Sequence, residues 1–160
     1  MEWERGLIKA WDMLHRCENP DCDHKWFIMH DVKNPVCPFC GTRVRGDILQ
    51  LDICARPRGK KGQWRKHSTL IAENNTPLFK WHTRTDVFPD EKADTGLEAY
   101  ICSHEKAWYL INSRAEGLIS PMGSPVPAGK AIRLTNGTVF RACREENGSL
   151  IKVSIIKGMK

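Results

Sequence analysis

The sequence lacks several features that would assign it to a large class of proteins. No apolar run approaches the length of a membrane span, and the first residues do not form a signal peptide. The count of seven cysteines is odd, which argues against a secreted disulfide framework. The 160 residues also contain no glycine-rich loop followed by a strand lysine, no His-Arg-Asp loop and no Asp-Phe-Gly triplet, so they hold no kinase domain. We therefore expect a cytoplasmic protein with reduced thiols and no membrane partner.

Composition and length are those of an ordinary globular protein. Hydrophobic residues make up 41% of the chain and charged residues 28%. At 160 residues, the chain suits one medium domain or two small ones. It has no internal repeat and no low-complexity tract, so local motifs have to define its organisation.

Four cysteines in two close pairs form the most informative motif. Four residues separate Cys17 from Cys22, and two separate Cys37 from Cys40 within a Cys-Pro-Phe-Cys-Gly knuckle. The fourteen residues between the pairs are enough for a hairpin that brings the two knuckles face to face. Four thiolates complete a closed tetrahedral Zn²⁺ site, which stabilises structure and leaves no open position for chemistry. The sequence therefore predicts one structural zinc ion.

Other residues of metal-binding or nucleophilic type are less specific. Three nearby histidines are alternative ligands for one position of the zinc site, although we expect them mainly at the surface: His15, His24 and His30. The three remaining cysteines fall within or beside predicted strands, where buried structural thiols are expected: Cys54, Cys102 and Cys143. The triplet Cys102-Ser103-His104 does not predict catalysis, because neighbouring strand residues point to opposite faces and no partner acid is evident. We expect no enzymatic activity.

The net charge of +6 comes from a single segment. Residues 56–66 hold six basic residues and no acidic one, and the rest of the chain is neutral. Glycine and proline within the segment predict an exposed loop. Its candidate contacts to nucleic acid, or to an acidic protein surface, are Arg56, Arg58, Lys60, Lys61, Trp64, Arg65 and Lys66.

Periodicity predicts a mainly β protein. Residues 2–15 form an amphipathic helix with Trp3, Leu7, Trp11 and Leu14 along one stripe, which needs a surface to cover. The tryptophans would pack on the cysteine module or on an upstream domain. Within that module, which spans 16–46, residues 25–28 are expected to form a strand. Further strands are expected at 47–54, 68–72, 77–82, 98–102, 107–112, 131–134, 138–143 and 149–156.

The many short strands indicate a β-sandwich. Asn136-Gly137 and Asn147-Gly148 are strong turn signals between apolar runs, and 119–130 is rich in loop residues. We predict a domain of residues 1–46, comprising the helix and zinc ribbon, and a sandwich domain of residues 47–160.

The second half of the chain resembles a forkhead-associated (FHA) domain, a β-sandwich that binds phosphothreonine peptides. Trp108-Tyr109-Leu110 matches the family's Trp-x-Leu strand. The segment 134–138 matches its Leu-x-x-Gly-Asp turn, with Thr138 in place of the acid. The resemblance covers roughly residues 48–156 and implies an FHA-like sandwich.

The resemblance also implies ligand-binding residues. Arg84 lies where the family has the arginine that meets the phosphate, and Asn112 and Ser113 would hold the peptide backbone. The family's Ser-x-x-His falls at residues 95–98, where this chain has Thr-Gly-Leu-Glu. The histidine is missing and Glu98 would repel phosphate, so the motif is degenerate.

The whole arrangement is similar to the C-terminal accessory region of some bacterial serine/threonine kinases. There a four-cysteine knuckle precedes an FHA-like unit with a Leu-x-x-Trp-His segment, here Leu78 to His82. This resemblance implies a non-catalytic protein-interaction module of bacterial phospho-signalling, which binds a phosphothreonine peptide or docks a partner constitutively. The alternatives are a nucleic-acid-binding module, using the ribbon and segment 56–66, and a purely structural accessory domain.

Overall fold

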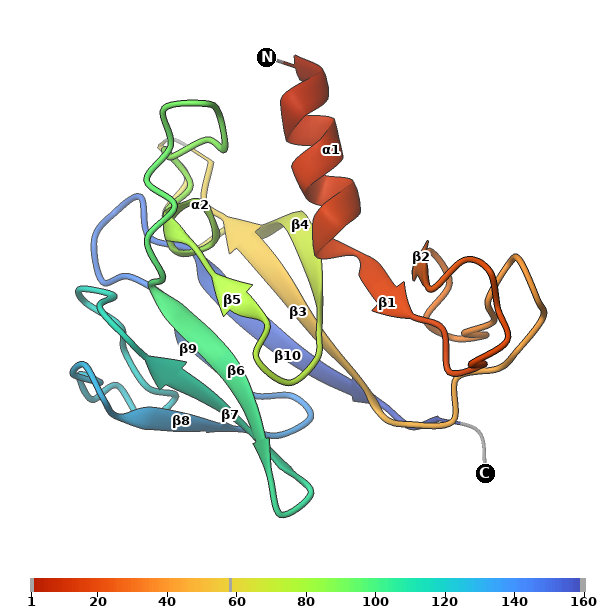
Figure 1. Ribbon diagram of the computed structural model, residues 1–160. Helices are drawn as coiled ribbons and strands as arrows, with labels where there is room; N and C mark the ends of the chain where they lie inside the picture. The colour runs from red at the N-terminus through yellow and green to blue at the C-terminus, as the bar shows by residue number, and fades with distance from the viewer. Residues whose placement is uncertain (1, 58, 159–160) are drawn as a thin grey trace.

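The computed structural model describes residues 2–57 and 59–158, so the candidate residue Arg58 lies outside the described residues. The predicted fold class is confirmed: the protein is mainly β, with an N-terminal helix and a cysteine cluster (Figure 1). Its elements are α1 (Glu2–Asp12), β1 (Leu14–Arg16), β2 (Trp26–Ile28), β3 (Ile48–Ala55), β4 (Arg65–Ala72), β5 (Pro77–Leu78), α2 (Lys80–Thr83), β6 (Ala99–His104), β7 (Ala107–Asn112), β8 (Ala131–Leu134), β9 (Val139–Arg141) and β10 (Leu150–Ile156).

Two four-stranded antiparallel sheets pack face to face. Their strand orders are β4-β3-β10-β9 and β5-β6-β7-β8. Residues from both sheets form one buried cluster, to which the alternating positions Leu49, Leu51 and Ile53 of β3 contribute. This alternation is what a strand with one covered face requires.

A second buried cluster joins the cysteine unit to the sandwich. Phe27 of β2 and Met29, directly after this strand, share the cluster with Ile48 of β3 and Ile71 of β4. Ile48 interrupts the alternation of β3 in the sequence because it faces the cysteine unit, whereas Leu49 faces the sandwich core. The two parts of the chain therefore share apolar packing at their junction.

Three local predictions were wrong. The helix ends at Asp12 rather than residue 15, because Leu14 pairs with Ile28 in the β1–β2 hairpin. Residues 80–83 form the short helix α2 rather than the end of a strand. Strand β4 begins at Arg65, so Arg65 and Lys66 lie in a sheet rather than in the basic loop.

Helix α1 docks against β4 and the region of α2 through one face. His82 Nε2 lies 3.1 Å and 3.2 Å from the two carboxylate oxygens of Asp12, and the Arg5 guanidinium lies 4.0 Å from the centroid of the Phe88 ring. None of the described helices is long and apolar enough to cross a membrane.

Candidate metal centre and docking surface

The four predicted cysteines converge on one point. The sulfur atoms of Cys17, Cys22, Cys37 and Cys40 all lie within 4.8 Å of one another. The Sγ atoms of Cys17 and Cys40 are 3.6 Å apart, and those of Cys22 and Cys37 are 4.0 Å apart. Four sulfurs at about 2.3 Å from a central Zn²⁺ would be about 3.8 Å apart, so this donor set fits a tetrahedral metal ion.

Local hydrogen bonds shape the second knuckle. Cys37 donates its backbone N–H to the Thr42 carbonyl at 2.8 Å, and Gly41 donates to the Cys37 carbonyl at 2.9 Å. Gly41 has a φ of 72°, a conformation that favours glycine and explains its place directly after the motif.

The thiols of the cluster differ in acidity. Burial raises the pKa of the Cys22 thiol to about 12. Hydrogen bonding to the side chain and backbone of Thr42 lowers the pKa of Cys40 to about 6. Zinc binds cysteine as the thiolate, so metal binding would release protons from thiols of this cluster.

The nearby histidines do not join the cluster among the described residues. His15 Nδ1 lies 3.1 Å from a carboxylate oxygen of Glu73, and the His24 ring stacks on Phe39 at a centroid distance of 3.9 Å. His30 is exposed. Within the part of the chain that the structure describes, the candidate metal cluster consists of the four cysteines alone.

Arg84 is already paired with a carboxylate. Its side chain is only 22% exposed, and its guanidinium Nη1 lies 2.9 Å from a Glu145 oxygen. Its backbone forms an isolated bridge with Gly148, which fixes the arginine beside the 145–147 turn. A phosphate at Arg84 would have to compete with Glu145.

Two further cations lie beside Arg84, and neither was singled out from the sequence. Arg114 contacts Asp94 at 2.6 Å and Glu98 at 3.2 Å, while Lys80 lies 3.9 Å from Asp94. Hydrogen bonds from Arg114 and the Gly96 N–H lower the pKa of Asp94. Together with Arg84, these residues line a small cavity of about 170 Å³.

Glu98, the residue at the position where the sequence comparison with FHA domains expects a histidine, has a structural role. The backbone carbonyl of Glu98 accepts hydrogen bonds from the N–H groups of Ser113, Arg114 and Ala115 at 3.0–3.2 Å. At Gly96, a Cβ atom would collide with the Arg114 guanidinium, so glycine allows that side chain to lie across the loop. Segment 94–98 and loop 113–116 are therefore held together by their own groups.

Asn112 lies inside the loop rather than on its surface. It is 1% exposed, and its side-chain N–H groups donate to the carbonyls of Ala115 and Val126 at 3.0 Å and 2.7 Å. Its side-chain oxygen accepts from the Ala115 N–H at 2.8 Å. The direct peptide contact expected of Asn112 is inconsistent with this burial. Ser113 is half-buried and stays a candidate.

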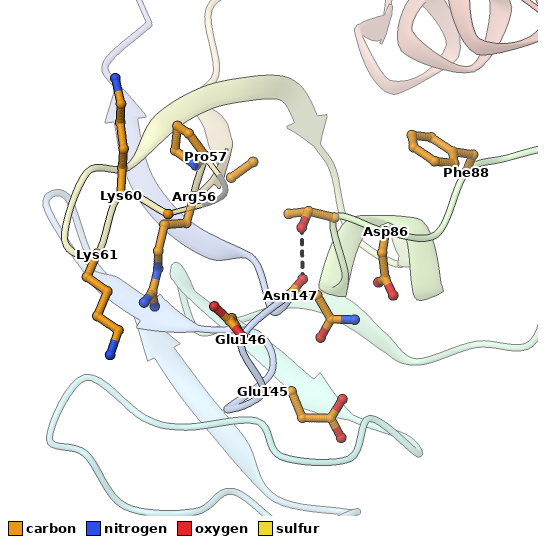
Figure 2. Close-up of a pocket in the computed structure, with 12 residues that line it drawn as sticks. Arg56, Pro57, Lys60, Lys61, Asp86, Phe88, Glu145, Glu146 and Asn147 are labelled. Atoms are coloured by element: carbon orange, nitrogen blue, oxygen red, sulfur yellow. Dashed lines mark hydrogen bonds between the residues drawn. The ribbon is translucent and has the colours of Figure 1, made fainter.

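A large groove adjoins Arg84. It has a volume of about 1220 Å³ and lies between residues 55–57 and 59–61, at and after the end of β3, and the segments 85–88 and 145–147 (Figure 2). Basic side chains from one loop line one part of it, namely Arg56, Lys60 and Lys61. Acidic side chains line the other, namely Asp86, Glu145 and Glu146. The backbone and hydroxyl of Thr85 hold the 145–147 turn by hydrogen bonds to the Asn147 carbonyl at 2.8 Å and 3.0 Å.

The predicted basic residues do not form one surface. The guanidinium groups of Arg56 and Arg141 lie 4.8 Å and 4.9 Å from the Trp64 ring, so this tryptophan is engaged within the protein. Lys66 lies 3.9 Å from Asp52 on the neighbouring strand. Only part of the basic segment therefore faces the groove.

The remaining nucleophilic residues form no catalytic constellation among the described residues. Cys54 and Cys143 are buried, whereas His104 is exposed at the end of β6. In the Asp12–His82 pair, the Phe79 N–H donates to Nδ1 of His82 at 2.9 Å, and Nε2 faces the Asp12 carboxylate. Because both ring nitrogens are engaged, His82 has no free lone pair to abstract a proton.

Comparison with protein-family models, curated proteins and solved structures finds no match to this chain.

Proposed function

We propose that this protein is a non-catalytic, zinc-stabilised protein-interaction module of bacterial phospho-signalling, with a degenerate FHA-like sandwich. The cluster of four sulfurs supports the zinc ion as a structural cofactor. The extent of the sandwich, from Ile48 to Ile156, agrees with the roughly 48–156 covered by the resemblance. The docking surface in this proposal is the end of the sandwich that carries Arg84, Ser113 and the groove.

The main support for this proposal is that the cations at the Arg84 end of the sandwich are already paired with carboxylates. Arg84 faces Glu145, while Arg114 and Lys80 face Asp94. A phosphothreonine would have to displace these carboxylates, and it gains less from a cation that is already neutralised. We therefore favour constitutive docking of a protein segment over phosphate-dependent capture.

Nucleic-acid binding is the second candidate, supported by Lys60 and Lys61, which are exposed and lie after the end of β3. The opposite part of the groove carries Asp86 and Glu146, which would repel a phosphate backbone. Trp64 is also occupied by two guanidinium groups instead of being free to stack on a base. These features place protein docking first.

The test is capture by immobilised peptide libraries in matched phosphothreonine and unphosphorylated forms, at physiological salt. We expect the wild-type protein to capture both forms equally. Arg84→Ala should reduce capture, because it leaves Glu145 unpaired and alters the docking surface. Glu145→Gln frees the guanidinium and should shift capture towards the phosphorylated library by about threefold or more.

Two outcomes would count against the proposal. Capture by wild type of phosphorylated peptides alone would overturn constitutive docking and favour a phosphopeptide reader. Failure to capture either library, together with salt-sensitive binding of single-stranded DNA that is lost in Lys60→Ala/Lys61→Ala, would support the nucleic-acid candidate.

A further inference from the structure

The groove beside Arg84 contains exposed charges of both signs that have no partner within the described residues. Lys60 and Lys61 form no ion pair there, and neither do Asp86 and Glu146 on the segments opposite. The volume of about 1220 Å³ exceeds the range typical of small-molecule pockets. The groove therefore has the size and the free charges to bind a segment of another protein.

Arg56 is the cation of this groove that the fold holds in place. Its guanidinium lies 4.8 Å from the centroid of the Trp64 ring, and the Arg141 guanidinium lies 4.9 Å from the same ring. Arg141 also donates from Nη2 to the carbonyls of Cys143 and Glu145, at 3.1 Å and 2.9 Å. Neither arginine has a carboxylate partner in the part of the chain that the structure describes.

The two guanidinium groups near one ring create an excess of positive charge. Burial, followed by the charge of Arg56, lowers the pKa of Arg141. The Nε atoms of both arginines are buried and find no hydrogen-bond acceptor among the described residues. An anion beside Arg56 would offset this repulsion and accept hydrogen bonds from its guanidinium. At Arg84 and Arg114, in contrast, the chain's own carboxylates already occupy that position.

We propose that the groove binds a segment of a partner protein that carries both charges: a carboxylate that binds Arg56 and Lys61, and a cation that binds Asp86 and Glu146. Figure 2 shows the Arg56 and Lys61 side chains extending in the same direction from the chain after β3, whereas the two acids come from the opposite segments. A uniformly anionic ligand, nucleic acid included, would be repelled by the acids, and a uniformly basic one by the cations.

This inference rests on the proposed docking function and specifies the chemistry of the partner. It is tested by capture of the full zinc-loaded chain on immobilised peptide libraries at physiological salt. The libraries share an uncharged background and differ at two positions of variable spacing, which hold Glu and Lys, Glu twice, Lys twice or Gln twice. The wild type should bind the Glu/Lys library about fivefold or more tightly than each of the others, and high salt should reduce this preference.

Charge reversal identifies the contacts. Lys61→Glu should weaken capture on the Glu/Lys library by about fivefold or more and favour the Lys/Lys library, because the groove then presents acids on both sides. Glu146→Lys should favour the Glu/Glu library for the corresponding reason. The matched control is Lys130→Glu, the same charge change at an exposed lysine outside the groove, and it should bind as the wild type does. Circular dichroism and zinc content verify that each variant is folded.

The outcomes separate this inference from the docking function on which it rests. Equal capture on all the libraries would overturn the inference and leave constitutive docking intact. Preference of the wild type for a uniformly charged library, or unchanged preferences in both Lys61→Glu and Glu146→Lys, would also overturn the inference alone. Absence of capture on every library would overturn the inference and the proposed docking function together.

Discussion

At the scale of single residues, the Asp12–His82 pair shows how one buried contact positions a whole element. The two side chains are 6% and 2% exposed and are separated by 70 positions in the chain. The Phe79 N–H donates to Nδ1 and thereby fixes the histidine tautomer, so Nε2 carries the proton and donates a hydrogen bond to the Asp12 carboxylate. A buried carboxylate held in this way makes the orientation of α1 costly to change.

We predict that His82→Leu destabilises the protein by about 3 kcal/mol, because it leaves the Asp12 carboxylate and the Phe79 N–H buried without partners. Urea denaturation followed by circular dichroism measures the change. The matched control is His104→Leu at an exposed histidine, which should change stability by less than about 0.5 kcal/mol. Equal effects of the two substitutions would contradict a structural role for the pair.

At the scale of elements, the cysteine unit has little secondary structure of its own, so we expect its fold to depend on a bound metal ion. The hairpin β1–β2 has three residues in each strand, too few to be stable alone. The four sulfurs and a small shared cluster with Ile48 and Ile71 are its main internal constraints. The sandwich, in contrast, has its own large core.

We predict that a strong zinc chelator abolishes hydrogen-exchange protection of residues 14–46 while most protection in β3, β7 and β10 persists. Cys37→Ser should have the same effect and reduce bound zinc from about one ion per chain to nearly none. Cys102→Ser, at a thiol outside the cluster, should retain the metal. Uniform loss of protection along the chain would show that the sandwich cannot fold without the metal.

At the scale of the whole molecule, a few polar contacts link the cysteine unit to the sandwich. Glu73, directly after β4, contacts His15 at 3.1 Å and accepts a hydrogen bond from the Arg16 backbone N–H at 3.2 Å. The close contact with His15, followed by the hydrogen bond from the Arg16 N–H, lowers the pKa of Glu73 below its ordinary value of 4.5. The carboxylate therefore stabilises the folded state when it is ionised.

We predict that this contribution is present above pH 4.5 and is lost as the pH falls through the lowered pKa of the folded state. Glu73→Gln should lower the melting temperature by a few degrees at pH 7 and have a smaller effect near pH 3. Thermal unfolding of both proteins at the two pH values measures this difference. An equal effect at both pH values would show that the charge of Glu73 does not stabilise the junction.

Local sequence patterns determined the parts of this protein that depend on neighbouring residues. The spacing of the two cysteine pairs identified the four residues of the metal cluster, because a knuckle is formed within a few residues. Alternation of apolar residues located most strands of the sandwich, because strand periodicity requires only that one face be covered.

Tertiary structure decided the rest, because those features depend on partners that are distant in the sequence. Pairing with Ile28 ends α1 before Leu14, and the contact with His82 turns the apolar stripe of α1 outwards. The fold also brings the Glu145 carboxylate into an ion pair with Arg84. It buries the Asn112 side-chain amide, which donates hydrogen bonds to loop carbonyls. No local periodicity encodes which carboxylate meets which cation, since that choice is made only when the sheets and their loops come together.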